Sequence, residues 1–177
     1  MQARLLIINC PGANFLHIPM GTFGLCDFLN QRKIPAKILN LAFYDERDMA
    51  SLIDHHMELF RPTHIGLILH WQETLEGGIR VAQYIKSRTD PVKIICGGFT
   101  AGYFGEALLK RCPSIDYVIK GDPERPMEFL LNGTKEQEIP NLIYRDGNDI
   151  QINEVSYFMK LPQNTPPFMA GMNEVRG

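Results

Sequence analysis

Two short loops, Gly97-Gly98 and Gly121-Asp122-Pro123-Glu124, contain the residues best suited to bind a ligand. Each loop follows an apolar segment typical of a buried strand. Paired glycines remove two side chains where the backbone turns, which lets a ligand approach the main chain closely. Asp122 and Glu124 add oxygen acceptors for hydroxyl or amide groups. The pattern predicts a ligand shelf, while an ordinary helix start capped by Asp122 is the alternative interpretation.

Two further loops add aromatic and imidazole groups. The first, residues 10–21, is long for a connection between strand and helix, and it contains Asn14, Phe15 and His17. Long loops in compact domains are often functional, although its prolines also fit a merely rigid turn. The other loop holds the only tryptophan of the chain, within His70-Trp71-Gln72-Glu73-Thr74. A large flat ring there suits a planar ligand, and a tryptophan packed under the following helix is the alternative.

Strands and helices must alternate to position these loops. Continuous apolar runs predict strands, and segments with helical spacing separate them. The expected strands are residues 5–8, 36–41, 65–69, 92–96 and 117–119, and the expected helices are residues 20–33, 48–60, 75–88, 104–111 and a short one ending at 131. Such alternation implies right-handed crossovers and a doubly wound α/β domain. We expect a flavodoxin-like or Rossmann-like five-stranded parallel sheet in the order 2-1-3-4-5, with ligands beyond the strand ends.

The last quarter of the chain has a different character. Residues 141–152 read as a small β-hairpin around an Asp146-Gly147 turn, and the composition beyond it favours an extended tail. The predicted organisation is an α/β domain over residues 1–133, a β-hairpin appendage over residues 134–158 and a linker or disordered tail over residues 159–177.

Composition and charge disfavour several function classes. The net charge of −2 over 177 residues gives no reason to expect nucleic-acid binding. The first apolar run is too short for a signal peptide or a membrane span, so we expect a cytoplasmic protein with no membrane partner. Cys10, Cys26, Cys96 and Cys112 match no zinc or iron–sulfur spacing, and we expect reduced thiols that are mostly in the core.

Familiar activities of this fold are disfavoured by the same loops. A receiver domain needs acidic residues after the first strand and a phosphate-accepting Asp after the third, but Asn9-Cys10 and His70-Trp71 stand there. The first loop lacks the hydroxyl-rich phosphate cradle of a flavodoxin, and no G-x-G-x-x-G opens the first helix. Phosphotransfer and the binding of flavin or dinucleotide phosphates therefore lose support.

Three motifs follow one another in a fixed order: Pro11-Gly12 with Pro19-x-Gly21, the stretch 97–109 and the stretch 116–126. Together they resemble the amino-terminal cobalamin-binding domain of the cobalamin-dependent radical S-adenosylmethionine enzymes. Residues 139–147 are similar to the hairpin that follows that domain, so the resemblance covers roughly residues 3–153. Gly102 and Pro123 depart from the family pattern, which has Thr or Ser and a small residue there.

The resemblance implies cobalamin with its benzimidazole displaced from cobalt and buried in the domain. The D-x-H-x-x-G motif of other cobalamin modules is missing, and a protein histidine need not bind cobalt; His17 or His70 as axial ligand is the minority alternative. Gly98→Val is expected to fill the cleft and abolish cofactor retention without unfolding the protein. The expected cofactor-binding residues are Asn14, Phe15, His17, His70, Trp71, Gln72, Glu73, Thr74, Gly97, Gly98, Phe99, Thr100, Gly121, Asp122 and Glu124.

The resemblance also implies a partner. In that family the next domain carries C-x-x-x-C-x-x-C for a 4Fe-4S cluster that cleaves S-adenosylmethionine, and this sequence lacks the motif. We therefore expect a module that catalyses nothing alone and serves a radical S-adenosylmethionine catalytic domain, in the same or a separate chain, in methyl transfer or related radical chemistry. The alternatives are a nucleotide- or sugar-nucleotide-binding α/β domain and an interaction module that has lost its ligand.

Overall fold

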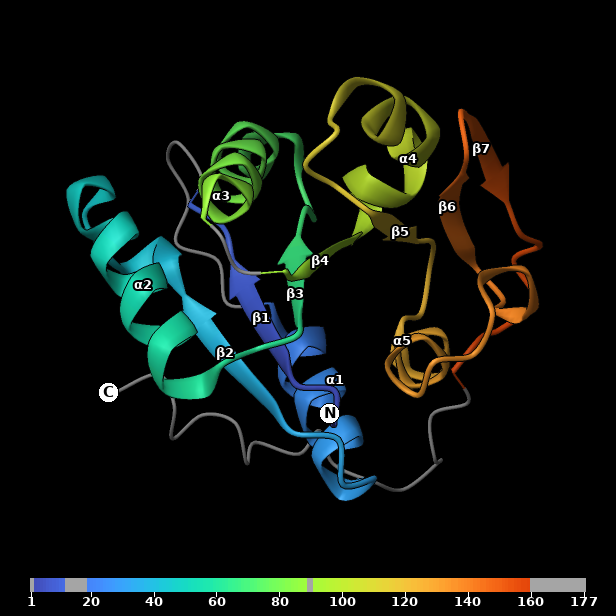
Figure 1. The fold of residues 1–177 in the computed structure, drawn as a ribbon, viewed down its shortest axis with the longest axis horizontal. Helices are drawn as coiled ribbons and strands as arrows, with labels where there is room; N and C mark the ends of the chain where they lie inside the picture. Colours follow the sequence, from blue (N-terminus) through green and yellow to red (C-terminus); the bar gives the residue numbers. More distant parts are fainter. Residues whose placement is uncertain (1, 12–18, 89–90, 160–177) are drawn as a thin grey trace.

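One mixed sheet runs through the computed structural model of the chain, which describes residues 2–11, 19–88 and 91–159 (Figure 1). Five of its strands are parallel, in the order β2-β1-β3-β4-β5. Their bounds are β1 (Leu5–Asn9), β2 (Ala36–Asn40), β3 (His64–Ile68), β4 (Lys93–Gly97) and β5 (Tyr117–Ile119). The α/β class and the order of the parallel strands agree with the prediction from alternating apolar runs.

The sheet has seven strands, not the expected five. The hairpin strands β6 (Leu142–Asp146) and β7 (Asp149–Ile152) continue the sheet beyond β5. β6 pairs antiparallel with β5, so that Tyr117 lies opposite Tyr144. An uncovered β5 would present unpaired backbone groups, and the hairpin satisfies them. The hairpin is therefore part of the main sheet, a long-range pairing for which its own sequence carries no signal.

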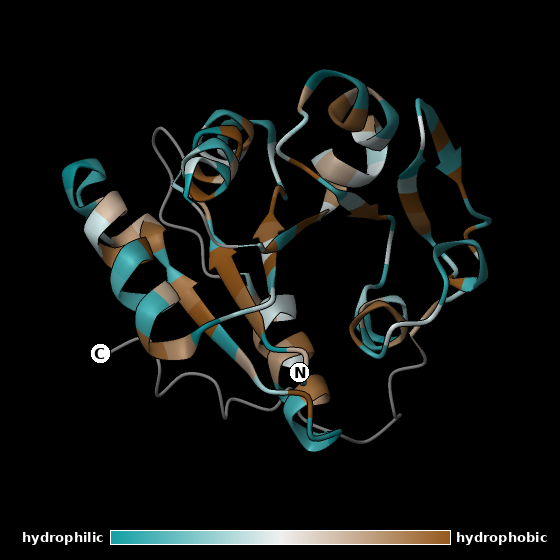
Figure 2. Cartoon of the chain, in the orientation of Figure 1, coloured by the Kyte–Doolittle hydropathy of each residue, from teal (hydrophilic) through white to brown (hydrophobic). Residues whose placement is uncertain are grey.

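Helices cover both faces of the sheet (Figure 1). One face carries α2 (Met49–Phe60), α3 (Leu75–Ser87) and α4 (Phe99–Arg111), whereas α1 (Met20–Gln31) and α5 (Glu124–Leu131) lie on the other. Successive strand side chains point to opposite faces, so each buried strand supplies both cores. Figure 2 shows the apolar strands between helices whose outer surfaces are hydrophilic. Short 3-10 turns are η1 (Leu41–Phe43), η2 (Glu46–Asp48), η3 (Gln72–Thr74) and η4 (Glu136–Glu138).

Helix α4 begins at Phe99, five residues before the predicted start at Phe104. Phe104 itself has non-helical backbone angles, φ −101° and ψ 15°, which divide the helix at a kink. The first turn is held from outside the helix, because the backbone N–H groups of Thr100 and Ala101 donate to the carbonyl oxygen of Leu69. Phe99 and Tyr103 are exposed, so these apolar residues do not follow the helical spacing of the buried face. The expected spacing in the sequence therefore begins only after this turn.

Asp116, directly before β5, ties this short strand to its neighbours. Its Oδ2 accepts hydrogen bonds from Lys86 Nζ at 2.7 Å and from the Ile94 backbone N–H at 2.8 Å, and Lys93 Nζ lies 3.1 Å from Oδ1. Burial of the carboxyl acts to raise its pKa, but these hydrogen bonds outweigh burial and lower the pKa below its ordinary value. Asp116 therefore holds in place the strand that leads to Gly121 and to Glu124 at the start of the next helix.

We expect Asp116→Asn to lower the free energy of unfolding at pH 7 by about 2 kcal/mol, because hydrogen bonds to a charged group are lost. A lowered pKa stabilises the folded state above the ordinary Asp pKa of about 3.9, and this contribution disappears as the pH falls through the lower folded-state pKa. Urea unfolding from pH 7 to pH 2 measures both effects. The exposed Asp149→Asn is the control, and an Asp116→Asn protein as stable as wild type would contradict this role.

The helices of the described residues do not include one with the length and apolar character needed to span a membrane.

Candidate functional site

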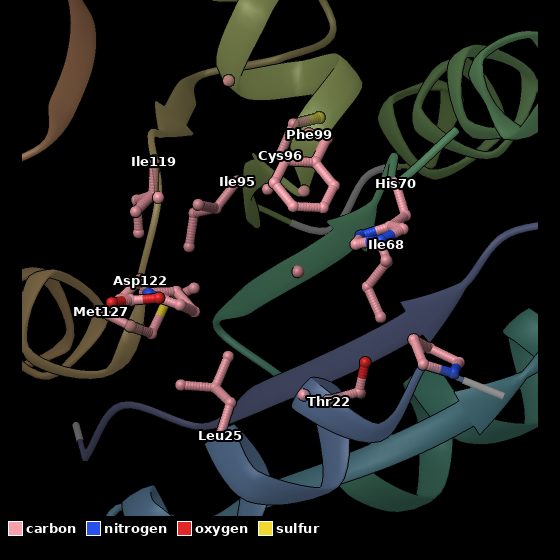
Figure 3. A pocket seen from close by; sticks show the side chains of 18 of the residues that line it. Thr22, Leu25, Ile68, His70, Ile95, Cys96, Phe99, Ile119, Asp122 and Met127 are labelled. Atoms are coloured by element: carbon pink, nitrogen blue, oxygen red, sulfur yellow. The ribbon is translucent and has the colours of Figure 1, made fainter. Parts of the chain in front are cut away.

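A cavity of about 950 Å³ opens at the carboxyl ends of the parallel strands, between α1 and α5 (Figure 3). The second half of α1 approaches α5, where the Arg125 guanidinium lies 6.0 Å from the Phe28 ring centre. Arg32, just beyond α1, lies 3.5 Å from Glu128 in α5. The first half of α1 borders the cavity instead. The cavity therefore lies over the middle strands β3 and β4, on the face that carries α1 and α5. The helices that follow these two strands, α3 and α4, cover the opposite face.

Two strand glycines open this cavity. Gly66 lies in the middle of β3, and Gly97 ends β4; both line the cavity. A Cβ atom at Gly97 would meet no atom within 4 Å, and one at Gly66 would make only ordinary contacts, 3.7 Å from side-chain carbons of Leu5 and Ile7. Larger residues at either position would thus extend into empty space and occupy the cavity.

Gly98 has a different role from its neighbour Gly97. Its φ is +100°, and a Cβ atom there would lie 2.7 Å from the carbonyl oxygen of Leu69. Gly98 therefore allows the start of α4 to pack against the backbone that follows β3. The expectation that Gly98→Val would fill the cleft and leave the fold intact is wrong, because the missing side chain faces main chain.

The lining of the cavity changes from the middle of the strands toward their carboxyl ends. α1 and α5 both begin near the strand ends and run back along the sheet, so residues later in each helix lie deeper. The floor is apolar and comprises Ile7, Leu25, Ile95 and Met127. Polar side chains lie above it, where the two helices start; we call Thr22, Asp122 and Glu124 the collar. The mouth carries the ring side chains of His70, Phe99 and Tyr103.

The collar contains a buried carboxyl group. Glu124 is 8% exposed, and its Oε2 has no hydrogen-bond partner among the described residues. Burial raises the pKa of Glu124; a backbone hydrogen bond opposes this, and the charge of Asp122 adds to it. A buried carboxyl without a partner for one of its oxygens is stabilised by a ligand that donates a hydrogen bond to that oxygen.

Aromatic rings gather at the mouth. Phe99 is 72% and Tyr103 84% exposed, although both are large apolar side chains. The His70 ring centre lies 4.7 Å from that of Phe99 and 5.0 Å from that of Trp71. Trp71 is 48% exposed, so it does not pack under α3 as the alternative interpretation held. An exposed apolar surface beside a cavity is typical of a binding site.

The structure brings about half of the predicted site residues together. Those that line the cavity are His70, Gly97, Gly98, Phe99, Gly121, Asp122 and Glu124. Those described but outside its lining are Trp71, Gln72, Glu73, Thr74 and Thr100. Of these, the Thr100 hydroxyl donates to the His70 carbonyl oxygen at 3.3 Å, so it supports the mouth from behind. Asn14, Phe15 and His17 lie outside the described residues.

Sequence reasoning missed the wall made by α1 and the floor. On α1 the residues missed are Thr22 and Leu25, whereas Pro19, Met20 and Gly21 belong to the indicated loop 10–21 but were not among the expected binding residues. Gly66 did carry a signal, because a glycine within an apolar strand often marks a close approach. Val155 carried none. It reaches the cavity because Asn141 folds the last described segment back, accepting from the Ser156 and Tyr157 backbone N–H groups at 3.1 Å each.

The cysteines are free thiols, as the sequence predicted, and three of the four are buried. Burial raises the pKa of Cys10 to about 12 and that of the cavity residue Cys96 well above its ordinary value. Neither thiol is therefore an activated nucleophile. Among the described residues, no group of three or more His, Cys, Asp or Glu side chains is arranged to hold a metal ion.

No protein-family model and no curated protein matches the chain. Several solved structures match the chain. The radical S-adenosylmethionine methyltransferase TsrM from Kitasatospora setae, solved with cobalamin and a 4Fe-4S cluster, aligns with a TM-score of 0.76 at 19% identity over 87% of this chain and 31% of its own. The cobalamin-dependent S-adenosylmethionine radical enzyme OxsB, solved with aqua-cobalamin and S-adenosylmethionine, gives 0.74 at 14% identity over 89% of this chain and 23% of its own.

At these identities the likeness shows the fold. The chain has the fold of part of these two enzymes and spans less than a third of the length of each. The resemblance found in the sequence motifs is thereby confirmed at the level of the fold.

Proposed function

We propose that this chain is the cobalamin-binding module of a radical S-adenosylmethionine enzyme. One observation carries the proposal: the cavity at the strand ends changes from an apolar floor through a polar collar to an aromatic mouth. Cobalamin has the matching order of parts, namely an apolar benzimidazole, a sugar phosphate and a broad corrin ring. The two enzymes that share the fold were solved with cobalamin bound.

The dimensions and chemistry of the site fit this cofactor in part inside and in part outside the cavity. A volume of about 950 Å³ is at the upper end of small-molecule sites, enough for the nucleotide tail but not for the whole cofactor. The floor would take the benzimidazole, and the exposed Phe99 and Tyr103 rings would support the corrin. Gly97 provides a cradle that a side chain would fill. Cobalamin supplies cobalt-centred chemistry when bound, and this chain binds, orients and shields it.

The rival functions find less support in the same residues. A nucleoside diphosphate carries more negative charge than the single phosphodiester of cobalamin and needs more cationic partners, but Lys120 is the only Lys or Arg in the described lining, where it is accompanied by Asp122 and Glu124. In an interaction module without a ligand, the buried Oε2 atom of Glu124 would have no group to bind, since the described residues offer it no hydrogen-bond partner. His70, which lines the mouth, is the described candidate for an axial ligand of cobalt and belongs to the proposal as the minority alternative.

The proposal includes a catalytic partner. A radical S-adenosylmethionine domain with a 4Fe-4S cluster, in the same or a separate chain, would carry out methyl transfer or a related radical reaction, and this chain alone would catalyse nothing. The short share of TsrM and OxsB that it spans supports this. The division into residues 1–133, 134–158 and a linker from residue 159, a place in the cytoplasm and the absence of nucleic-acid or membrane partners belong to the same proposal.

Titration with hydroxocobalamin tests the proposal directly. We expect the desalted protein to retain the corrinoid near one equivalent, with a visible spectrum shifted to that of cobalamin with displaced benzimidazole. We also expect an increase in Tm, since a ligand at 100 times its Kd stabilises the folded state by about 2.7 kcal/mol. ATP and UDP-glucose should leave the Tm unchanged. Loss of all corrinoid on desalting under both oxidising and reducing conditions, or stabilisation by the nucleotides alone, would overturn the proposal.

A further inference from the structure

Two buried polar side chains line the collar, one from each helix that flanks the cavity. Thr22 lies in the first turn of α1 and Glu124 begins α5. Both are more than nine-tenths buried, with exposures of 6% and 8%. Figure 3 shows the Thr22 hydroxyl oxygen directed into the cavity. Buried polar groups at such a place are costly unless something in the cavity binds them.

The side chain of Glu124 determines which chemical group of a ligand can bind at the collar. Its Oε2 has no partner in the described part of the chain, and Asp122 only adds negative charge to its surroundings. A carboxylate oxygen accepts hydrogen bonds and cannot donate them, so its partner must be an O–H or N–H donor. Thr22 offers a hydroxyl that can donate and accept. The pair is therefore complementary to a group rich in hydroxyls.

The position of Thr22 and Glu124 between the floor and the mouth indicates which part of the ligand they contact. Leu25 and Met127 follow Thr22 and Glu124 by about one helical turn and form the apolar floor beneath them. Phe99 and Tyr103 lie at the mouth above. When the base of a nucleotide tail occupies the floor and the corrin lies over the mouth, the ribose is held between them. The ribose carries hydroxyl groups and sits at the level of the collar.

We propose that Thr22 and Glu124 bind the ribose hydroxyls of the cofactor's nucleotide tail and so make the chain select corrinoids that carry this tail. The inference rests on the proposed function and assigns a specificity to it. Thr22 was not among the residues that the sequence indicated, and the two residues act together only because α1 and α5 flank the same cavity.

The test compares two corrinoids, hydroxocobalamin and diaquacobinamide, which lacks the nucleotide tail. We expect wild type to bind hydroxocobalamin more tightly. Glu124→Leu should weaken hydroxocobalamin binding about 10- to 100-fold, as expected for the loss of a hydrogen bond to a charged group, and leave cobinamide binding unchanged. Thr22→Val, which keeps the shape of the side chain, should weaken hydroxocobalamin binding about 5- to 10-fold. Glu58→Leu, on the exposed side of α2, is the control.

Stability of the ligand-free protein provides a second readout. Because Glu124 is buried without a full set of partners, Glu124→Leu should raise the Tm of the ligand-free protein by about 3 °C or more while it weakens cofactor binding. A residue with a purely structural role would do the opposite: its replacement would lower the Tm and weaken both corrinoids alike.

The outcomes separate the two proposals. Wild-type protein that binds neither corrinoid would overturn the proposed function. Wild-type protein that binds hydroxocobalamin, with both variants equal to it or with both corrinoids weakened equally, would overturn the role of Thr22 and Glu124 alone. Weaker binding of hydroxocobalamin alone in both variants, with a raised Tm for Glu124→Leu, would support the role of Thr22 and Glu124.

Discussion

Gly97→Val is expected to abolish cobalamin retention without destabilising the protein. The new side chain would enter space where no atom lies within 4 Å of the Cβ position, and that space is the cavity itself. Gly97 is not among the glycines with positive φ, so valine can adopt its backbone conformation at the end of β4. We expect Kd for hydroxocobalamin to rise more than about 100-fold, since the floor can no longer be reached, with a free energy of unfolding within about 0.5 kcal/mol of wild type.

The visible spectrum after desalting and urea unfolding of the ligand-free protein measure these two effects. Gly24→Val is the matched control, because Gly24 also has no atom within 4 Å of a Cβ position but lies on the exposed side of α1, outside the cavity lining. Wild-type retention by Gly97→Val would show that this cavity does not hold the cofactor. Equal loss in Gly24→Val would make the effect unspecific.

Gly98→Val, one residue further along, is expected to destabilise the fold by about 3 kcal/mol or more. Its φ of +100° lies in a region that a β-branched residue rarely adopts, and strain of this kind costs roughly 1–3 kcal/mol. The Cβ atom would also lie 2.7 Å from the Leu69 carbonyl oxygen and 2.9 Å from the His70 backbone nitrogen, which are main-chain atoms with little freedom to move. Helix α4 would have to shift away from the end of β3.

Urea unfolding and far-UV circular dichroism distinguish this result from that of Gly97→Val. We expect the unfolding midpoint of Gly98→Val to decrease, and cofactor retention to be lost together with stability. An unfolding free energy equal to that of wild type, with only cofactor binding lost, would mean that the side chain points into the cavity after all. The same substitution at two neighbouring glycines therefore reports separately on the cavity and on the turn.

The sequence predicted the fold well where the signals were local. Apolar runs such as 5–8 and 92–96 alternate with amphipathic segments, and this alternation determines a doubly wound domain with the order 2-1-3-4-5. The prediction from sequence failed where the structure depends on a contact with a residue far away in the sequence. The start of α4 at Phe99 depends on hydrogen bonds to Leu69, and the place of the hairpin depends on the exposed edge of β5. Neither contact has a signature in the segment that makes it.

For the site, the sequence by itself determined which loops stand at the strand ends and that glycines and acidic residues occupy them, because strand ends and turns are encoded by short-range patterns. Only the tertiary structure decided which glycine opens the cavity. Gly97 and Gly98 are adjacent and chemically identical, but they point to opposite sides of the chain, one into empty space and the other at the Leu69 backbone. That Thr22 and Glu124 line the same cavity was likewise decided by the packing of α1 and α5 on one face of the sheet, since no local pattern relates residues so far apart.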